Sequence, residues 1–230
     1  MRCSAAGCRA EATYANRTVL ELGAGAGGLV TVALVRAGAR VLATDGDPGV
    51  LDFLEANVRS NVVGAVGARA GTWRLTSKTS KRTRPVERRG RGKHHFEVAL
   101  AQRLDTAQAG AFLGAERLCW ADEDAVAAVA ARLPELDLVV AADVVFRTID
   151  TEALVATLEA LAKRGAEVVV AHTRRFERED EAFFALLAGR FDVAPVPPDE
   201  LHPTFGRGGD AGLTGVLRLR ARAEREAGVT

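Results

Sequence analysis

The chain has 230 residues, 48% of them hydrophobic, and a formal net charge of +1 at pH 7. This length suffices for one domain with a complete core, and a near-neutral charge points to no particular charged partner. We find no apolar run of about 18 residues and no signal-peptide pattern, so we expect no membrane partner and a location in the cytoplasm, with the nucleus also open.

Basic charge is concentrated in one segment. Between Ser77 and His95, eight Lys and Arg residues accompany a single acid, a local charge of +7 that leaves −6 on the remainder. Because the segment has few apolar groups to offset the entropy of ordering, we predict a disordered basic insert at about residues 77–110. No aromatic residues alternate with the cations, so we expect no nucleic-acid partner.

The cysteines indicate neither disulfides nor a metal centre. Cys3, Cys8 and Cys119 are an odd, sparse set with no CxxC pair and no histidine at ligand spacing. We therefore expect free thiols in a reducing compartment and no metal site. We expect a monomer.

The stretch from Thr18 to Gly28 reads TVLELGAGAGG. It predicts a buried strand, a tight glycine turn and the start of a helix that continues to Arg36. The free N–H groups at the start of that helix favour polar or anionic ligand groups. The turn is therefore predicted to be the floor of a cofactor site.

Two cofactor classes are compatible with this turn. The spacing Gly23-x-Gly25-x-x-Gly28, with Asp45 about 20 residues further on, matches the dinucleotide fingerprint. Glu21, two residues before the first glycine, and the clustered glycines and alanines favour S-adenosylmethionine instead. For either cofactor, a carboxylate at the end of the second strand can accept both hydroxyls of a ribose.

Further along the chain, predicted strands alternate with predicted helices. The apolar strand that ends at Asp143 would bring a third group to the edge that already holds the glycine turn and Asp45. The last two strands have no helix between them, which predicts an antiparallel pair. We expect strands at 40–45, 71–76, 115–120, 136–143, 166–171, 191–196 and 215–220, and helices at 48–59, 122–133, 151–162 and 178–187.

A set of motifs is more specific than any one of them. It consists of VLELGAG at 19–25, LCW at 118–120, ADVVF at 142–146 and HTRRFER at 172–178. In this order the motifs resemble the eukaryotic methyltransferase-like proteins of methyltransferase family 16, many of which methylate protein lysines. The resemblance covers about residues 18 to 220, apart from the basic insert.

The resemblance implies an α/β fold, a Rossmann-like seven-stranded methyltransferase sheet flanked by helices, with the last strand antiparallel. We expect a single methyltransferase domain at 18–222, after an unassigned segment at 1–17 and before a tail at 223–230. The cofactor implied is S-adenosyl-L-methionine, and the partner implied is a protein substrate that presents a lysine side chain.

By position, the resemblance also implies the cofactor site. The acid and glycine turn would lie against the methionine and ribose parts, Asp45 would bind the ribose hydroxyls, Trp120 would flank the adenine, and Ala142 would line the pocket. The expected cofactor-binding residues are Glu21, Gly23, Ala24, Gly25, Asp45, Trp120 and Ala142.

Asp143 and Phe146 are the expected catalytic residues, since they match the family's post-strand motif of an acid, two residues and an aromatic. A sulfonium methyl group is already electrophilic, so the enzyme must align a neutral amine and exclude water. Removing the proton of a lysine at pH 7 costs about 4 to 5 kcal/mol. We expect Asp143 to hold the ammonium before it loses a proton to water, and Phe146, where the family usually has tyrosine, to pack against the lysine stem.

Three functions stay open at this point. The first is methyl transfer to a protein lysine, with other nucleophiles not excluded. The second is a non-catalytic or truncated binding module, because family members usually carry a Trp-containing segment upstream and only 17 residues precede Thr18 here. The third is a nicotinamide-dependent oxidoreductase, although Tyr14, the only tyrosine, is in no Tyr-x-x-x-Lys pair.

Overall fold

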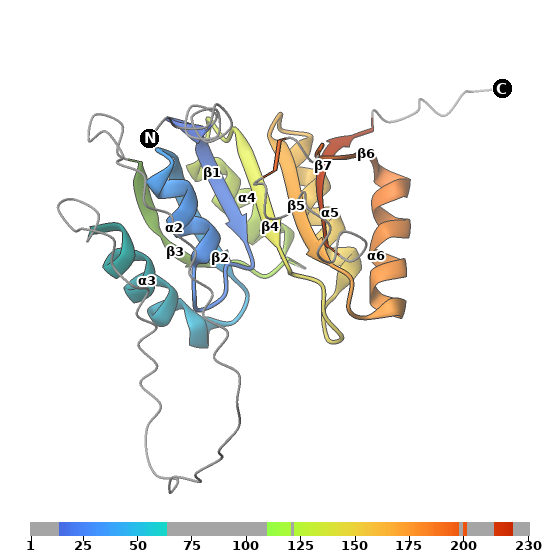
Figure 1. The fold of residues 1–230 in the computed structure, drawn as a ribbon, viewed down its shortest axis with the longest axis horizontal. Coiled ribbons are helices and arrows are strands. Elements are labelled where there is room, and N and C mark those ends of the chain that lie inside the picture. Colours follow the sequence, from blue (N-terminus) through green and yellow to red (C-terminus); the bar gives the residue numbers. More distant parts are fainter. Residues whose placement is uncertain (1–13, 64–109, 121, 198–199, 202–213, 223–230) are drawn as a thin grey trace, which may run out of the picture.

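A computed structural model of the protein describes residues 14–63, 110–120, 122–197, 200–201 and 214–222. The expected basic insert, apart from Gly110, the strand predicted at 71–76 and the tail at 223–230 lie outside the described residues. The remaining elements follow one another as alternating strands and helices (Figure 1). The strands are β1 (Thr18–Leu22), β2 (Arg40–Asp45), β3 (Ala111–Arg117), β4 (Leu138–Ala142), β5 (Glu167–Thr173), β6 (Phe191–Pro195) and β7 (Thr214–Ala221), and the helices are α2 (Leu29–Arg36), α3 (Pro48–Val63), α4 (Glu123–Arg132), α5 (Thr151–Ala162) and α6 (Glu177–Arg190).

One mixed sheet of seven strands organises the molecule, in the order β3-β2-β1-β4-β5-β7-β6. The five strands from β3 to β5 in this order are parallel, and β7 is antiparallel to both β5 and β6. The expected Rossmann-like sheet with an antiparallel last strand is therefore confirmed. The order is that of a doubly wound sheet at β3-β2-β1-β4-β5, and the inserted antiparallel strand distinguishes it from the usual dinucleotide-binding arrangement.

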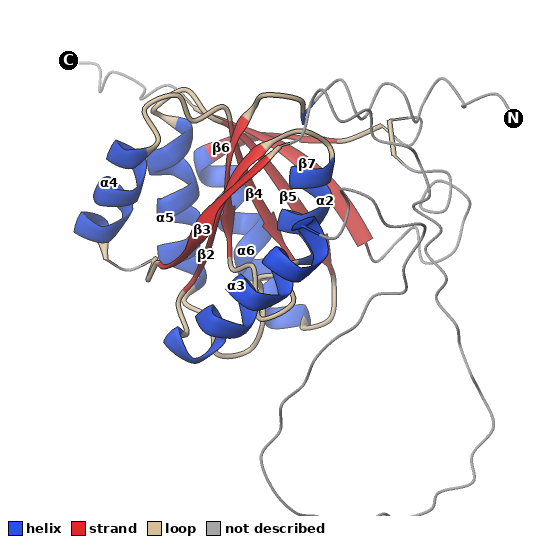
Figure 2. Cartoon of the chain, turned by 90° about the vertical axis from the view of Figure 1, so that its left-hand side faces the viewer, coloured by secondary structure: helices blue, strands red, loops and turns tan. Residues whose placement is uncertain are grey.

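Helices cover both faces of the sheet, as Figure 2 shows. Every residue of β1 is buried, as expected for a central parallel strand. Successive side chains of a strand point to opposite faces, so Leu20 and Leu22 join the core beneath α4, α5 and α6, while Val19 joins the core beneath α2. None of the described helices is long and apolar enough to cross a membrane.

The register brings the expected site residues to one edge. Leu22 of β1 lies beside Thr44 of β2 and Ala141 of β4, so the residues that follow these strands emerge side by side. Gly23 and Asp143 follow β1 and β4, and Asp45 is the last residue of β2. The carboxyl ends of these strands form the lower edge of the sheet in Figure 1. The prediction that three strands bring these residues to one edge of the sheet is confirmed.

The strand predicted at 115–120 was wrong in its bounds, because β3 runs from Ala111 to Arg117. Gly114, with a φ of 135°, lies where the register of β3 shifts against β2. A glycine inside a strand interrupts the residue pattern by which strands are predicted from sequence. Leu118 has left the strand, although its N–H still donates to the carbonyl oxygen of Asp45 at 3.0 Å. The other predicted elements that fall within the described residues differ from the observed ones only at their ends.

A substitution at Gly28 would test the packing of α2 on α3. It has a φ of 56°, and a Cβ there would lie 2.5 Å from Val58 Cγ2 and 2.7 Å from Leu54 Cδ1. We expect Gly28→Ala to lower the free energy of unfolding by about 2 to 4 kcal/mol, because left-handed strain is added to overpacking. Gly25→Ala is the matched control, with a φ of 62° and no neighbour within 4 Å of its Cβ. It should lose only about 1 to 2 kcal/mol. Urea denaturation without ligand measures both, and equal losses would contradict the packing described.

Candidate cofactor and substrate site

The glycine turn is tied to the elements beside it. Gly23 and Gly25 have φ values of 66° and 62°, which L side chains rarely adopt. Between them, the N–H of Ala24 donates to the carbonyl oxygen of Thr44 at 2.9 Å. Asn57 of α3 donates from Nδ2 to the carbonyl oxygen of Ala26 at 2.8 Å. These hydrogen bonds fix the conformation of the turn. At Gly25 no heavy atom would lie within 4 Å of an added Cβ, so a ligand can approach the backbone there.

Asp45 closes one end of this surface. Its Oδ2 accepts a hydrogen bond from Gly25 N at 2.9 Å, and its Oδ1 accepts one from Asp47 N at 3.0 Å. A carboxylate has about four acceptor positions, so two remain for the hydroxyl groups of a ligand. The carboxylate is therefore held in place by the turn and still able to bind.

Glu21 lies under the turn rather than on it. The residue is 3% exposed, its Oε2 accepts a hydrogen bond from the Thr31 hydroxyl of α2, and its carbonyl oxygen accepts one from the Thr44 hydroxyl at 2.7 Å. Burial raises the pKa of Glu21 to about 7, and the charge of Asp45 adds to this, while hydrogen bonds from Thr31 oppose it. The group therefore changes charge near neutral pH.

Trp120 and the loop after β4 close over the first glycine. A Cβ at Gly23 would lie 2.7 Å from Val144 Cγ1 and 3.4 Å from Trp120 Cζ2. The buried Nε1 of Trp120 has no hydrogen-bond partner among the described residues, while its carbonyl oxygen accepts a bond from Thr157 Oγ1 at 3.0 Å. Ala142, the last residue of β4, is partly buried next to this loop. The expected cofactor residues are thus within one region.

Asp143 is the first residue of that loop and has a φ of 60°. Its side chain is 48% exposed and forms an ion pair with Arg175, with Oδ1 3.0 Å from the guanidinium. The same oxygen accepts a hydrogen bond from Thr173 N at 3.2 Å. Phe146 follows, 44% exposed. Asp143 is therefore accessible, but an ammonium group would have to compete with Arg175 for it.

A buried His–Asp pair holds the loop that carries Arg175. His172 Nε2 lies 2.7 Å from Asp180 Oδ1, and Asp180 Oδ2 accepts hydrogen bonds from the N–H groups of Arg175 and Phe176 at 2.7 and 2.9 Å. Burial alone would raise the pKa of Asp180, but the bonds from Phe176, His172 and Arg175 outweigh it and hold the pKa below its ordinary value. Asp180 is therefore an anionic anchor for the loop.

Sequence reasoning assigned no role to Asn57, His172 or Asp180. Asn57 left a weak signal, because it stands on the face of α3 that carries Leu54 and Val58 and is 9% exposed there. A polar residue on an apolar helix face often has a specific partner, here the glycine turn. The motif at 172–178 contains His172, but the position of Asp180 beside it is a property of the folded chain.

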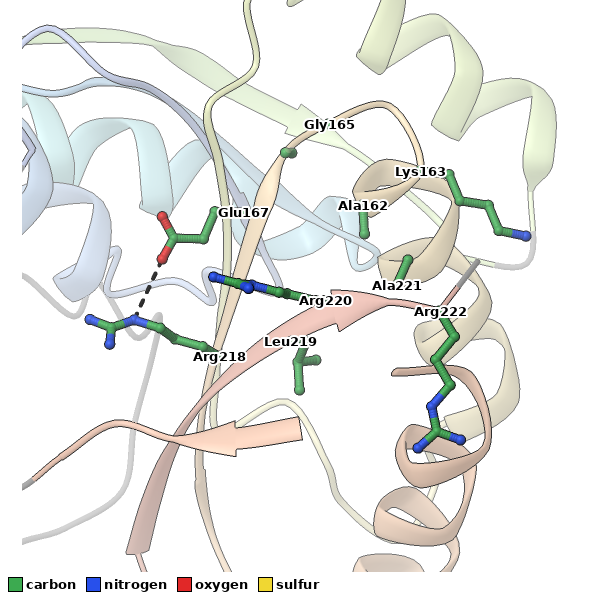
Figure 3. Close-up of a pocket in the computed structure, with 10 residues that line it drawn as sticks. Ala162, Lys163, Gly165, Glu167, Arg218, Leu219, Arg220, Ala221 and Arg222 are labelled. Atoms are coloured by element: carbon green, nitrogen blue, oxygen red, sulfur yellow. Dashed lines mark ion pairs between the residues drawn. The ribbon is translucent and has the colours of Figure 1, made fainter. Parts of the chain in front are cut away.

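A hollow of about 590 Å³ lies elsewhere, at the edge where β5 begins and β7 ends (Figure 3). Half of its lining residues are charged, including Lys163, Arg220 and Arg222, and Glu167 and Arg218 form an ion pair at 3.6 Å. It contains none of the expected site residues. The expected cofactor residues lie at the opposite edge of the sheet, on the glycine turn and the loops beside it.

Among solved structures, the chain resembles several methyltransferases at low identity. A TehB-like SAM-dependent methyltransferase from Corynebacterium glutamicum is 12% identical, with 94% of this chain and 88% of that chain covered and a TM-score of 0.47. Cofactor-bound Rv0187 from MTB is 16% identical, with 96% and 82% covered and a TM-score of 0.48. Magnesium protoporphyrin IX methyltransferase from Synechocystis with bound SAM is 14% identical, with 94% and 76% covered and a TM-score of 0.45. A search of curated protein sequences found no significant match.

The sheet order and the glycine turn define the class, a Rossmann-like methyltransferase. Within that class the chain belongs to the lysine methyltransferase family, whose sequence model matches residues 4–85 and 98–190. The chain is accordingly an S-adenosylmethionine-dependent methyltransferase by fold and family, and its cofactor is S-adenosyl-L-methionine. Neither the sheet nor the family is that of a nicotinamide-dependent oxidoreductase.

The residues present fit this cofactor. The open backbone at Gly25 admits a ligand, Asp45 retains acceptor positions, and the unpaired Nε1 of Trp120 is a donor facing no described partner. S-adenosylmethionine is a cation that also carries a ribose diol and an adenine, and an edge with Asp45, Asp143 and the titrating Glu21 offers acceptors of matching charge.

Glu21 makes stability depend on pH. From its ordinary pKa of 4.5 up to about 7, the unfolded chain loses the Glu21 proton while the folded chain retains it, so stability falls as pH rises. The loss is at most about 3 kcal/mol, at 1.36 per pKa unit. We expect Glu21→Gln to remove this slope, and Thr31→Val, which deletes a hydrogen bond to the carboxylate, to extend it to higher pH. Denaturant titrations of the ligand-free protein at several pH values measure this slope. Identical slopes in wild type and Glu21→Gln would show that Glu21 is not the group responsible.

Proposed function

We propose that this methyltransferase transfers a methyl group to a lysine side chain of a protein substrate. The observation that carries the proposal is the packing of the loop after β4 on the glycine turn, where Val144 lies against Gly23. This packing supports a position for Asp143 beside the cofactor floor, with its carboxylate half exposed. The exposed ring of Phe146 follows three residues later. An acid and an apolar wall together suit a lysine, whose stem is apolar and whose end is cationic.

The residues proposed to hold the cofactor are those that the family resemblance implies, and the geometry of the edge is compatible with them. The backbone of Gly23–Gly25 would lie against its methionine and ribose parts, and Asp45 would accept from the ribose hydroxyls. Trp120 would flank the adenine, and Ala142 would line the pocket. Glu21 would act from beneath the turn, where a nearby positive charge would favour its ionised form and lower its pKa. Cofactor binding would then release a proton near pH 7.

The bound cofactor supplies an electrophilic methyl group, so the protein needs only to position the amine, exclude water and allow deprotonation. Asp143 would bind the lysine ammonium and orient it until it loses a proton to water. Phe146 would pack against the methylene stem and keep water from that side. The ammonium would compete with Arg175 for the Asp143 carboxylate, so loss of their ion pair would favour its binding.

Asp45 provides the test of cofactor binding. We expect Asp45→Ala to raise the Kd for S-adenosylhomocysteine about tenfold to a hundredfold, since two hydrogen bonds to a charged acceptor are lost. Asp47→Asn is the matched control, because Asp47 lies two residues further on and accepts a hydrogen bond from Gly49 N at 2.8 Å; it should retain the affinity. Calorimetric titration measures both, with NAD as the negative ligand. Unchanged affinity in Asp45→Ala would remove Asp45 from the site.

Asp143 provides the test of the lysine reaction. Purified protein is incubated with cell extract and S-adenosylmethionine bearing a deuterated methyl group, and mass spectrometry identifies the modified side chains. We expect label on lysine, and we expect Asp143→Asn to lower kcat about tenfold to a hundredfold while the affinity for S-adenosylhomocysteine is retained, because the acid orients the amine and not the cofactor.

Asp192→Asn is the control for this experiment, because Asp192 is an exposed acid at the start of β6 and pairs with Arg222. Its kcat should equal that of the wild type. Label found only on arginine or histidine would replace lysine as the nucleophile. Wild-type turnover in Asp143→Asn would remove Asp143 from the catalytic residues.

A further inference from the structure

The loops after β4 and β5 meet at two points. Asp143 and Arg175 form the ion pair at 3.0 Å, and the guanidinium of Arg147 lies 5.5 Å from the ring centroid of Phe176. Two contacts between short loops fix their relative position more firmly than one. The surface beside Asp143 is therefore built jointly by both loops.

This surface is rich in arginine. Arg147, Arg174 and Arg175 are all exposed, and the guanidinium of Arg174 lies 4.5 Å from the ring centroid of Phe184. Of these three arginines, only Arg175 has a carboxylate partner within the described ranges. The guanidinium groups of Arg147 and Arg174 lie over aromatic rings, and no described acid is at ion-pair distance from them. The two guanidinium groups are thus oriented but not neutralised.

The orientation is built into the fold. Asp180 accepts hydrogen bonds from the backbone of Arg175 and Phe176, and it is itself held by His172. The His172 ring lies 5.7 Å from the rings of both Phe183 and Phe184, on the helix that supports Arg174. Groups held in their binding geometry lose less entropy when a partner arrives. The arginines are therefore preorganised for an anionic partner.

We propose that Arg147, Arg174 and Arg175 form a docking surface for an acidic protein segment that flanks the methylated lysine. The inference rests on the proposed function and adds the substrate class to it. A carboxylate of the substrate replaces Asp143 as the partner of Arg175. The exchange releases Asp143, which then binds the lysine ammonium. The acidic segment thereby both binds the arginines and frees Asp143 for the lysine.

A protein segment suits this surface better than RNA. The rings of Phe176 and Phe184 are covered by guanidinium groups, so they are not free to stack on bases. Asp143 stands among the arginines and would repel a continuous phosphate chain, whereas a lysine next to carboxylates matches both signs of charge. Charge complementarity therefore favours a mixed acidic and lysine-bearing peptide.

The test measures binding separately from catalysis. Full-length protein saturated with S-adenosylhomocysteine is titrated against three fluorescent lysine peptides of equal length, flanked by Asp and Glu, by Ser, or by Arg. We expect the acidic peptide to bind at least about tenfold more tightly than the serine peptide at low salt, with the preference declining as salt rises. An oligo-uridine of equal charge is the competitor, and we expect it to bind more weakly than the acidic peptide.

Variants locate the preference on the surface. Arg147→Gln and Arg174→Gln should each weaken acidic-peptide binding about two- to fivefold, the range of an exposed ion pair. Arg220→Gln is the control, an exposed arginine at the opposite edge of the sheet, labelled in Figure 3, and should bind like the wild type. Thermal unfolding verifies that each variant is folded. Equal binding of the three peptides, tighter binding of oligo-uridine, or an equal loss in Arg220→Gln would overturn the docking surface.

Arg175→Gln separates the exchange from simple attraction. With Asp143 already released, this variant should bind the acidic peptide more weakly and methylate the serine peptide faster than the wild type does. An unchanged or slower rate on the serine peptide would overturn the exchange. Tight acidic-peptide binding without methyl transfer would support the docking surface and count against the lysine reaction. Equal methylation of all three peptides would support the reaction and overturn the docking surface.

Discussion

The contact between Gly23 and the loop after β4 is the constraint on which the rest of the site depends. A Cβ at this position would lie 2.7 Å from Val144 Cγ1, so the loop can lie on the turn only where no side chain is present. The positive φ of 66° adds a second reason for glycine. Through this contact the turn that would bind the cofactor and the loop that carries Asp143 become one surface. A shift of either would separate the cofactor from its acceptor.

The electrostatics of this edge are consistent with a cationic cofactor and a cationic nucleophile. Asp45 and Asp143 are accessible acids at the ends of two strands. Glu21, a buried acid of β1 that faces α2, has a pKa of about 7. Arg175 balances Asp143 while no substrate is bound. Asp180, buried in the first turn of α6, accepts a hydrogen bond from the backbone of Arg175 and so anchors the loop that carries it. A buried acid thus positions the exposed ion pair at the site.

Sequence patterns predicted the parts of the fold that local chemistry decides. The glycine turn and β2 matched their predicted bounds because apolar runs and glycines specify them over a few residues. The bounds of β3 were missed because a glycine at a register shift breaks the local pattern. Partners such as Arg175 for Asp143, 32 positions apart in the printed numbering, or Asn57 for the turn, depend on tertiary packing that no local pattern encodes. Glu21 was predicted at the site, but its inward orientation toward Thr31 could come only from the folded structure.

The most direct test of the central claim is hydrogen exchange with and without S-adenosylhomocysteine, read by mass spectrometry on the intact chain. The cofactor should protect amides in the glycine turn at 23–28, in the segment 45–47 and in the loop that begins at Asp143, all at one edge of the sheet. The amides around the hollow, at 162–167 and 218–222, should exchange at the same rate in both states. Protection at the hollow with none at the turn would contradict the location of the cofactor site and the functional account built on it.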